Sequence, residues 1–298
     1  MVMEIKLGCG EWGFRELPME EHFEICKKFG FGTMEIGIGG GVPGRLPEKM
    51  TQEDIDSFIA LRDRYGIKTP FCCLENDFTL PTPEAHEENL EICLEQMRTA
   101  AQLGCTHIRL FAGFTPFADM TDEIWQRLFE AFEKAEALAT SLGMVISIET
   151  HGKIDVIDDT AVHTHTVTTH RDGLKRLLEG LPKKVGFNYD PGNIKAADPE
   201  DKRYALDLLN ARINYCHLKD WTYKGPGFIA GAPGDDDLDY AALLPQMEFD
   251  GIFLIEYEPT EDLLDGISRS LDYLNKLLPI REKSESKDRN RGSSGSVL

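Results

Sequence analysis

Eight short apolar segments alternate with longer amphipathic ones, and this alternation restricts the fold more than any other feature of the sequence. The apolar segments span residues 4–9, 33–38, 68–74, 106–111, 144–149, 185–189, 213–218 and 252–257. Most are continuous apolar runs, which is typical of parallel strands covered on both faces. Segments with helical periodicity follow them, at residues 18–29, 51–65, 83–103, 121–142, 171–179, 200–210, 240–247 and 261–278. The pattern predicts eight consecutive strand–helix units.

Eight such units in about 275 residues predict a single-domain (β/α)8 TIM barrel of the α/β class. The competing doubly wound sheet usually has fewer strands and a complete glycine-rich phosphate turn after the first strand. The sequence GCGEWGF contains only part of that fingerprint. We therefore predict one TIM-barrel catalytic domain over residues 1–280. Residues 281–298 carry almost no apolar side chains, which predicts a disordered C-terminal tail.

Composition limits the environment and the partners. Asp and Glu number 52 and Lys and Arg 32, a net charge of −20, so charge repulsion disfavours nucleic acid and anionic membranes as partners. No apolar run reaches the roughly 18 residues that span a bilayer, and the first ten residues lack the basic region of a signal peptide. The seven cysteines form no CxxC pair. This usage predicts reduced thiols in a cytoplasmic protein.

Four consecutive predicted strands each end in a side chain that can bind a metal. Glu149 closes the fifth strand, Asp190 the sixth, His217 the seventh and Glu256 the eighth. Function collects at the carboxyl ends of TIM-barrel strands, so the four side chains are expected at one level. Each one alone could be a helix cap or a satisfied core group, but four in register predict a metal site. Three carboxylates and an imidazole suit Mn²⁺, Mg²⁺, Co²⁺ or Zn²⁺.

Three further polar residues are candidates for substrate binding. His151 and Lys219 each lie two residues past a member of this quartet, although a loop position or a salt bridge would also explain them. Arg109 lies in the apolar segment HIRLF, where a guanidinium needs a partner. We expect it to pair with Glu75 or Glu35, with contact to a substrate oxygen as the alternative.

Aromatic and histidine residues in the connections allow weaker hypotheses. Trp12 and Phe114 lie in predicted strand-to-helix loops, where they would either wall a substrate site or pack generically. His163, His165 and His170 in HTHTVTTH resemble a metal-binding tract by spacing. No acidic or cysteine partner completes a set, so we interpret this segment as an exposed connection between the fifth and sixth strands.

With these residues in place, the sequence resembles the xylose isomerase-like TIM-barrel superfamily over residues 3–278. The resemblance rests on IETHG, NYDPGN, HLKD and IEYE, and GFGTMEIG before Glu35 is similar to the family's second strand. The superfamily contains sugar isomerases and epimerases and inosose-type dehydratases. In its ketose 3-epimerase and hydroxypyruvate isomerase branches, four corresponding residues hold one divalent ion, often manganese. The resemblance therefore implies a Mn²⁺ site of Glu149, Asp190, His217 and Glu256, with the two glutamates as the catalytic acid and base.

One position departs from the epimerase pattern. Ketose 3-epimerases of this kind commonly carry a histidine three residues after the aspartate, where this chain has Asn193. The departure weakens an assignment to that branch, and Asn193 is kept as a candidate substrate contact. Homo-oligomers are common in the family, but the sequence identifies no interface.

The implied reaction is the removal of a proton next to a carbonyl. Two glutamates on opposite faces of a small carbohydrate or polyol ketone would move the proton through an enediolate, which a divalent ion stabilises. Returning the proton to the same carbon gives an epimer, and returning it to the neighbouring carbon gives an aldose–ketose isomer. The acidic run GDDD after the seventh strand disfavours a phosphorylated substrate.

Three other functions compete with the sugar isomerase. A metal-dependent dehydratase of an inosose-like substrate would use the same site, with Lys219 or His151 as the acid. A nuclease of the endonuclease IV type would need three zinc ions, more histidine ligands and a basic groove, so we rank it lower. A barrel that only binds sugar is disfavoured because all four ligands are intact.

Overall fold

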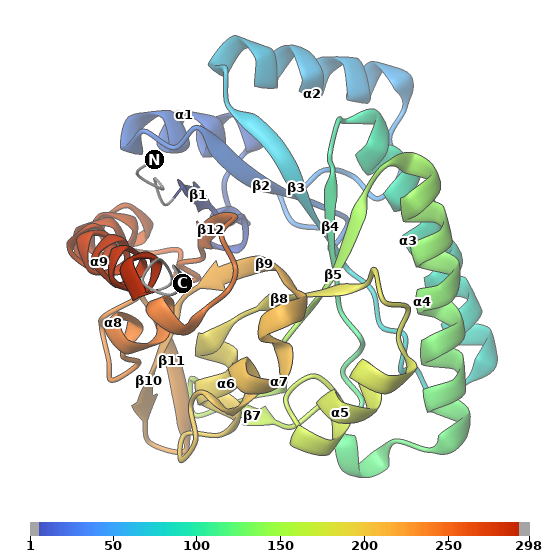
Figure 1. Ribbon diagram of the computed structural model, residues 1–298. Helices are drawn as coiled ribbons and strands as arrows, with labels where there is room; N and C mark the ends of the chain where they lie inside the picture. Colours follow the sequence, from blue (N-terminus) through green and yellow to red (C-terminus); the bar gives the residue numbers. More distant parts are fainter. Residues whose placement is uncertain (1–5, 292–298) are drawn as a thin grey trace, which may run out of the picture.

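The computed structural model describes the backbone of residues 6–291 and the side chains of residues 7–277, and it closes eight parallel strands into a barrel (Figure 1). The barrel strands are β1 (Lys6–Cys9), β2 (Thr33–Ile38), β3 (Lys68–Leu74), β4 (His107–Leu110), β5 (Val145–Glu149), β8 (Gly186–Tyr189), β9 (Ile213–Leu218) and β12 (Ile252–Ile255). Their order around the barrel is β1-β12-β9-β8-β5-β4-β3-β2. The predicted single-domain TIM barrel is confirmed.

Helices cover the outside of the barrel (Figure 1). They are α1 (Met19–Phe29), α2 (Gln52–Tyr65), α3 (Pro83–Gln102), α4 (Asp122–Leu142), α5 (Arg171–Gly180), α6 (Pro191–Ala197), α7 (Tyr204–Leu209), α8 (Tyr240–Leu243) and α9 (Leu263–Arg291). Local sequence sets several of their ends. Thr51 and Asp54 form a capping box at the start of α2, and Gly66 ends α2 in the left-handed conformation at φ 68°.

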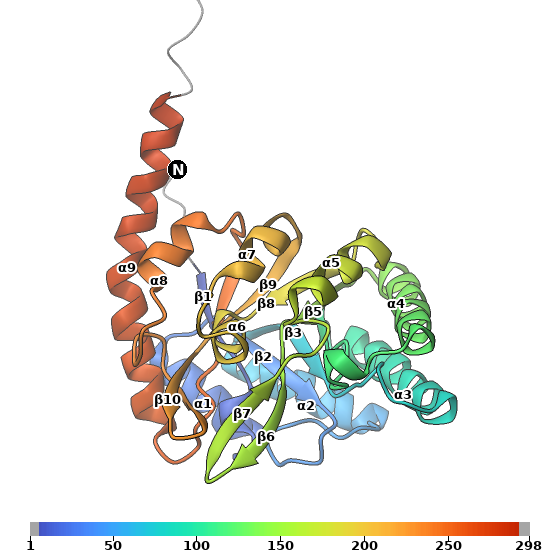
Figure 2. The same ribbon diagram turned by 90° about the horizontal axis from the view of Figure 1, so that it is seen from below.

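The carboxyl-terminal segment is only partly described. Helix α9 runs along the side of the barrel and projects beyond it to Arg291 (Figure 2), and residues 292–298 lie outside the described residues. The predicted disorder of residues 281–298 therefore stays a prediction. Within the described residues, no helix combines the length and the hydropathy needed to cross a membrane.

Two hairpins that the sequence analysis did not predict form a second sheet. Strands β6 (Lys153–Ile157) and β7 (Thr160–Thr164) follow β5, and β10 (Asp220–Lys224) and β11 (Gly227–Gly231) follow β9. They pair in the order β10-β11-β7-β6 and project from the same side of the molecule (Figure 2). Asp158 and Asp159, both at positive φ, form the two-residue turn between β6 and β7. This accessory sheet brings chain from two distant loops to the carboxyl end of the barrel.

The accessory sheet corrects our interpretation of HTHTVTTH as an exposed connection. Residues 160–164 form β7, and Val167 is fully buried. The ring of His163 packs edge-on against Trp221 of β10, with 4.8 Å between ring centroids. The histidine spacing therefore reflects strand pairing and packing.

A packed layer closes the barrel interior below its carboxyl end. Phe71, Tyr215 and Leu254, from three different strands, contact one another and are almost fully buried. Phe71 meets Tyr215 edge-on at 4.7 Å between ring centroids. The barrel interior is thus filled with side chains at this level, and open space for a ligand lies at the carboxyl-end rim.

Candidate metal centre

The four residues predicted from the strand ends converge at one rim of the barrel. Glu149 ends β5, His217 lies near the end of β9, and Asp190 and Glu256 directly follow β8 and β12. One ligand atom from each lies within 4.8 Å of all the others, and all four side chains are buried. We call these four residues the quartet.

The hydrogen bonding of His217 tests whether the quartet fits a cation. Its Nε2 lies 2.9 Å from Oε1 of Glu35, which directs the other nitrogen, Nδ1, toward the quartet. Within the described residues Nδ1 makes no hydrogen bond, and it lies 3.3 Å from Oε1 of Glu256 and 3.7 Å from Oε1 of Glu149. Oδ2 of Asp190 also makes no hydrogen bond there. Buried electron-pair donors that face one another and make no hydrogen bonds fit a shared cation, and a carboxylate on the outer imidazole nitrogen is the usual support for a histidine ligand.

Burial and mutual charge set the protonation of the metal-free quartet. Burial raises the pKa of Asp190 to about 7. The negative charges of Glu256 and Glu149 also raise it, whereas the positive charge of Lys219 lowers it. Burial also opposes ionisation of Glu149, but Arg109 and His217 outweigh it and lower its pKa to about 2. Glu256 and Glu35 raise the pKa of His217 despite its burial. The metal-free site therefore holds protons that a cation would displace.

Two buried cations hold the outer oxygens of the quartet glutamates. Nε of Arg109 lies 3.1 Å from Oε2 of Glu149, and Nζ of Lys219 lies 2.7 Å from Oε2 of Glu256. The expected pairing of Arg109 with Glu75 or Glu35 is thus wrong, because Glu149 at the neighbouring strand end is its ion-pair partner. Lys219 also lies 3.2 Å from Oδ2 of Asp190. Each glutamate keeps its Oε1 on the side of His217.

Asn193 connects two members of the quartet. Its side-chain amide donates to Oε1 of Glu149 at 3.2 Å, and its backbone N–H donates to Oδ1 of Asp190 at 2.9 Å. Its side-chain oxygen accepts a hydrogen bond from Nε1 of Trp221 at 3.2 Å. Asn193 is fully buried and orients ligands, so its predicted contact with substrate stays a prediction.

A cavity of about 220 Å³ opens beside the quartet. Its walls come from the barrel rim, from the loop after β1 and from β6, and they are lined by Trp12, Arg45, Glu75, Arg109, Phe111, Phe114, Glu149, His151, Ile154, Lys219, Glu256 and Glu258. The candidates His151, Lys219 and Arg109 therefore share one cavity with both glutamates. Trp12 and Phe114 also line it, as expected of aromatic walls.

The aromatic wall holds His151 in place. Its ring meets Phe111 and Phe114 edge-on, at 5.2 and 5.7 Å between ring centroids. Its Nδ1 lies 2.5 Å from the carbonyl oxygen of Gly152. Burial lowers the pKa of His151, which favours a neutral imidazole beside the cavity.

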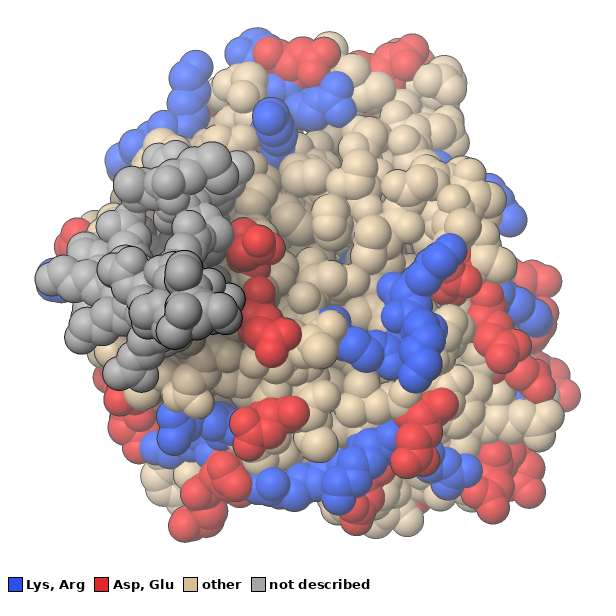
Figure 3. Space-filling model, viewed as in Figure 1, with Lys and Arg blue, Asp and Glu red and all other residues tan. Residues whose placement is uncertain are grey.

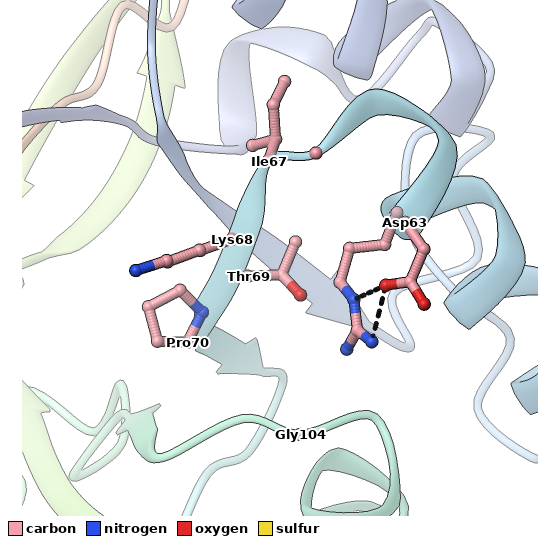
Figure 4. Close-up of a pocket in the computed structure, with 8 residues that line it drawn as sticks. Asp63, Ile67, Lys68, Thr69, Pro70 and Gly104 are labelled. Atoms are coloured by element: carbon pink, nitrogen blue, oxygen red, sulfur yellow. Dashed lines mark hydrogen bonds and ion pairs between the residues drawn. The ribbon is translucent and has the colours of Figure 1, made fainter.

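A larger pocket of about 460 Å³ lies away from the quartet, at the amino end of β3 (Figure 4). Figure 4 shows Lys68, Thr69 and Pro70 along the start of this strand, near Asp63 and Gly104. Asp63, the one acid of this lining, pairs with Arg62 at 2.9 Å. No set of metal-binding donors converges in this lining, and the amino end of TIM-barrel strands serves stability. We therefore place the candidate site in the smaller cavity beside the quartet, where such donors do converge.

Sequence reasoning missed the role of Glu35. This carboxylate is fully buried on β2 and accepts hydrogen bonds from the Tyr215 hydroxyl and from the backbone N–H of Glu11, the latter at 3.0 Å. It also fixes the ring of His217. Its position inside an apolar strand was a signal of burial, but nothing in the sequence pointed to His217 as its partner.

The other missed residues form an ion-pair group at the cavity. Arg45 is buried, binds the carboxylates of Glu11 and Glu75, and lies 4.8 Å from the ring centroid of Trp12. Glu258 lies 2.5 Å from Nζ of Lys219. These residues lie in loops, where no sequence periodicity indicates which side chains come into contact.

Comparison with known proteins places the fold in a family. The model of the xylose isomerase-like TIM barrel family matches residues 23–277, and the chain belongs to this family. A search of curated proteins finds no match to the sequence.

Three solved structures share the fold at low identity. The 3-keto-D-glucoside 4-epimerase YcjR from E. coli is 18% identical, with a TM-score of 0.68 over 92% of this chain and 99% of that one. The probable 3-DHS dehydratase AsbF from Bacillus anthracis is 17% identical, with a TM-score of 0.68 over 91% and 99%. A xylose isomerase-like TIM barrel protein from Mycobacterium smegmatis in complex with magnesium is 13% identical, with a TM-score of 0.71 over 94% and 98%.

Proposed function

We propose that this protein is a divalent-metal-dependent sugar isomerase or epimerase that transfers a proton between Glu149 and Glu256 on a small, unphosphorylated carbohydrate. The observation that carries the proposal is the quartet itself, in which two oriented glutamates and an imidazole nitrogen without a hydrogen bond meet beside a cavity. The family membership and the epimerase among the similar structures support it. Asp190 and His217 complete the ligand set, with Mn²⁺ favoured over Mg²⁺, Co²⁺ or Zn²⁺.

The chain's own residues orient both glutamates for proton transfer. When bound, a divalent ion would supply a Lewis acid for the oxygens beside the reacting carbon. Arg109 and Asn193 hold Glu149, and Lys219 holds Glu256. One glutamate takes the proton next to the carbonyl and the other returns a proton. Lys219 and His151, on the cavity wall, can bind substrate oxygens.

Charge around the cavity supports a neutral substrate. Its lining contains three cationic side chains, and each already has a carboxylate partner: Arg45 with Glu75, Arg109 with Glu149, and Lys219 with Glu256. Glu258 adds a fourth carboxylate. A phosphate would therefore find no unpaired cation in this lining. The proposed partner is a small sugar or polyol ketone.

The wider partner and location proposals rest on charge and cysteine usage. Basic and acidic side chains are interspersed on the face shown in Figure 3, and the whole chain carries −20, so we do not propose nucleic acid or an anionic membrane as a partner. All seven cysteines are buried, and none forms a disulfide within the described residues, which supports a cytoplasmic location. Homo-oligomers are common in the family, and the proposal includes no particular interface.

A dehydratase is the second candidate, and the position of Lys219 favours it. Nζ of Lys219 lies at the cavity wall beside Glu256. A glutamate would remove the proton next to the carbonyl, and the lysine ammonium would give a proton to the departing hydroxyl, which leaves as water. The dehydratase among the similar structures supports this alternative for an inosose-like substrate.

Hydrogen exchange tests both candidates. The protein is stripped of metal, reloaded with Mn²⁺, and incubated in D₂O with ketoses, aldoses and inososes, while deuterium incorporation is followed by NMR. We expect Mn²⁺-dependent deuterium next to a carbonyl, and the product then distinguishes epimerase, isomerase and dehydratase. Exchange that is equally fast without metal, or that survives replacement of both quartet glutamates by glutamine, would contradict the proposal.

A further inference from the structure

A second group of metal-binding side chains lies between β1 and α1, and it shares no residue with the quartet. Cys9 is the last residue of β1, and His22 and Cys26 lie one turn apart on α1. One ligand atom from each lies within 4.8 Å of the other two. The side chains are completely enclosed, with Cys9 1% exposed and the other two 0%. We call them the Cys9–His22–Cys26 cluster.

The imidazole of His22 is the observation that points to a ligand. Neither of its ring nitrogens makes a hydrogen bond within the described residues. Its ring stacks on Phe14 with 3.8 Å between centroids and 15° between planes, which fixes the ring without satisfying a nitrogen. Leaving a polar group buried and unsatisfied is costly. A cation shared with the two nearby sulfurs would remove that cost.

The two thiols differ in their readiness to ionise. Burial opposes ionisation of Cys26, but the Cys9 thiol and His22 outweigh it and lower the pKa of Cys26 to about 6. Burial and Cys26 raise the pKa of Cys9. Thiolates are the ligand form of cysteine, so a bound cation would displace the thiol protons.

We propose that Cys9, His22 and Cys26 form a buried three-donor site for a thiophilic d¹⁰ cation, Zn²⁺ or Cu⁺. Two sulfurs and an imidazole nitrogen are soft donors that select these ions, whereas the quartet offers mainly carboxylate oxygens. The spacing of His22 and Cys26 places both on one face of α1, and β1 supplies the third donor. Two thiolates cancel the charge of Zn²⁺, which limits the cost of burying the ion.

A cation bound at this site would link α1 to the segment after β1, which contributes Trp12 to the cavity wall. Cys9 is two residues before Glu11, whose backbone N–H donates to Glu35. Glu35 in turn orients His217. A cation at the Cys9–His22–Cys26 cluster would therefore stiffen the segment that carries Glu11 and Trp12 without taking part in the reaction.

The test is a cadmium titration of the full chain under reducing conditions, with Mn²⁺ present to occupy the quartet. Cd²⁺ stands in for Zn²⁺ because its thiolate complexes absorb in the ultraviolet. We expect one equivalent of Cd²⁺ to produce this absorption, and Cys9→Ser and Cys26→Ser to lose most of it. Cys93→Ser is the matched control, since Cys93 is buried on α3 and is not part of the cluster. His22→Phe should keep the thiolate absorption and weaken Cd²⁺ binding at least tenfold.

A measurement on the unmodified protein covers the case in which the serine variants do not fold. The X-ray absorption spectrum of one bound Zn²⁺, with Mn²⁺ present, should show two sulfurs at about 2.3 Å and a nitrogen at about 2.0 Å. Metal analysis of protein purified without added metal distinguishes zinc from copper. Oxygen and nitrogen neighbours only, no cadmium–thiolate absorption, or absorption unchanged in folded Cys9→Ser and Cys26→Ser would overturn the proposal.

Discussion

The two halves of the barrel contribute differently to the candidate site. The half formed by β5, β8, β9 and β12 ends in the four quartet residues. The half formed by β1–β4 ends in no quartet residue, but it supplies Glu35 to His217 and Arg109 to Glu149. The first half presents all four ligands together with Asn193 and Lys219, which help to hold them, whereas the second half contributes supporting residues.

This difference shows how a metal centre can depend on residues distant in the sequence. Glu35 and His217 lie on β2 and β9, which are not neighbours in the barrel, so their contact crosses the interior. The carboxylate fixes which ring nitrogen faces the quartet. Loss of such a residue should weaken the site while every ligand remains.

The largest effect is expected in the ligand half. Glu256→Gln removes a proposed proton-transfer group and a charged ligand, so we expect turnover to fall by about 10³-fold or more, since general acid–base catalysis contributes roughly 10²–10⁴-fold. The matched control is Glu258→Gln, which also loses a carboxylate partner of Lys219 but lies outside the quartet. The exchange assay in D₂O measures both. Equal losses in the two variants would show that the charge of Lys219, and not the quartet, is what matters.

A smaller effect is expected in the supporting half. Glu35→Gln keeps a hydrogen-bond acceptor near His217 but removes its negative charge, so Mn²⁺ affinity should fall roughly 10- to 100-fold, as for other residues that support metal ligands. Glu75→Gln is the control, because Glu75 pairs with Arg45 and has no hydrogen bond or ion pair to His217 within the described residues. Isothermal titration with Mn²⁺ gives the affinities. An unchanged affinity in Glu35→Gln would remove the proposed division between the halves.

The pH dependence of metal binding tests the electrostatics of the ligand half. Because burial raises the pKa of Asp190 to about 7, a proton occupies this carboxylate below neutral pH and must leave when a cation binds. The pKa of His217 is also raised, so a proton on its imidazole likewise competes with the cation. We expect the apparent Mn²⁺ affinity to fall by about tenfold or more for each pH unit below 7, because at least one proton is released on binding. An affinity independent of pH from about 5 to 8 would contradict this protonation scheme.

The smallest effect is expected from the accessory sheet. Ile154→Ala shortens an apolar side chain of the cavity wall, so KM should rise roughly fivefold while Mn²⁺ affinity stays constant, which corresponds to about 1 kcal/mol, the lower end of what small changes in a pocket contribute. Val156→Ala on the same strand is the control, because Val156 is 77% exposed and should have no effect. Steady-state kinetics on the substrate found by the exchange assay provide the comparison. A change in metal affinity would mean that the sheet also supports the quartet.

The sequence predicted the barrel and the positions of the quartet because both depend on the order of strand and helix segments along the chain. Continuous apolar runs followed by amphipathic segments define strand–helix units, and a parallel barrel brings all strand ends to one rim. Glu149, Asp190, His217 and Glu256 could therefore be placed together without knowledge of any side-chain contact. The same reasoning gave His151 and Lys219 a place on the cavity wall.

The tertiary structure decided how these residues are paired. With 52 acidic residues in the chain, the sequence offered Arg109 several partners, and only packing selected Glu149. The β6–β7 and β10–β11 hairpins were missed because their strands are only five residues long and form a sheet only with each other. Charged groups and strand edges that are buried lose their hydrogen bonds to water and must find partners in the protein. Which groups are buried together, across long separations in the sequence, is determined only when the chain folds.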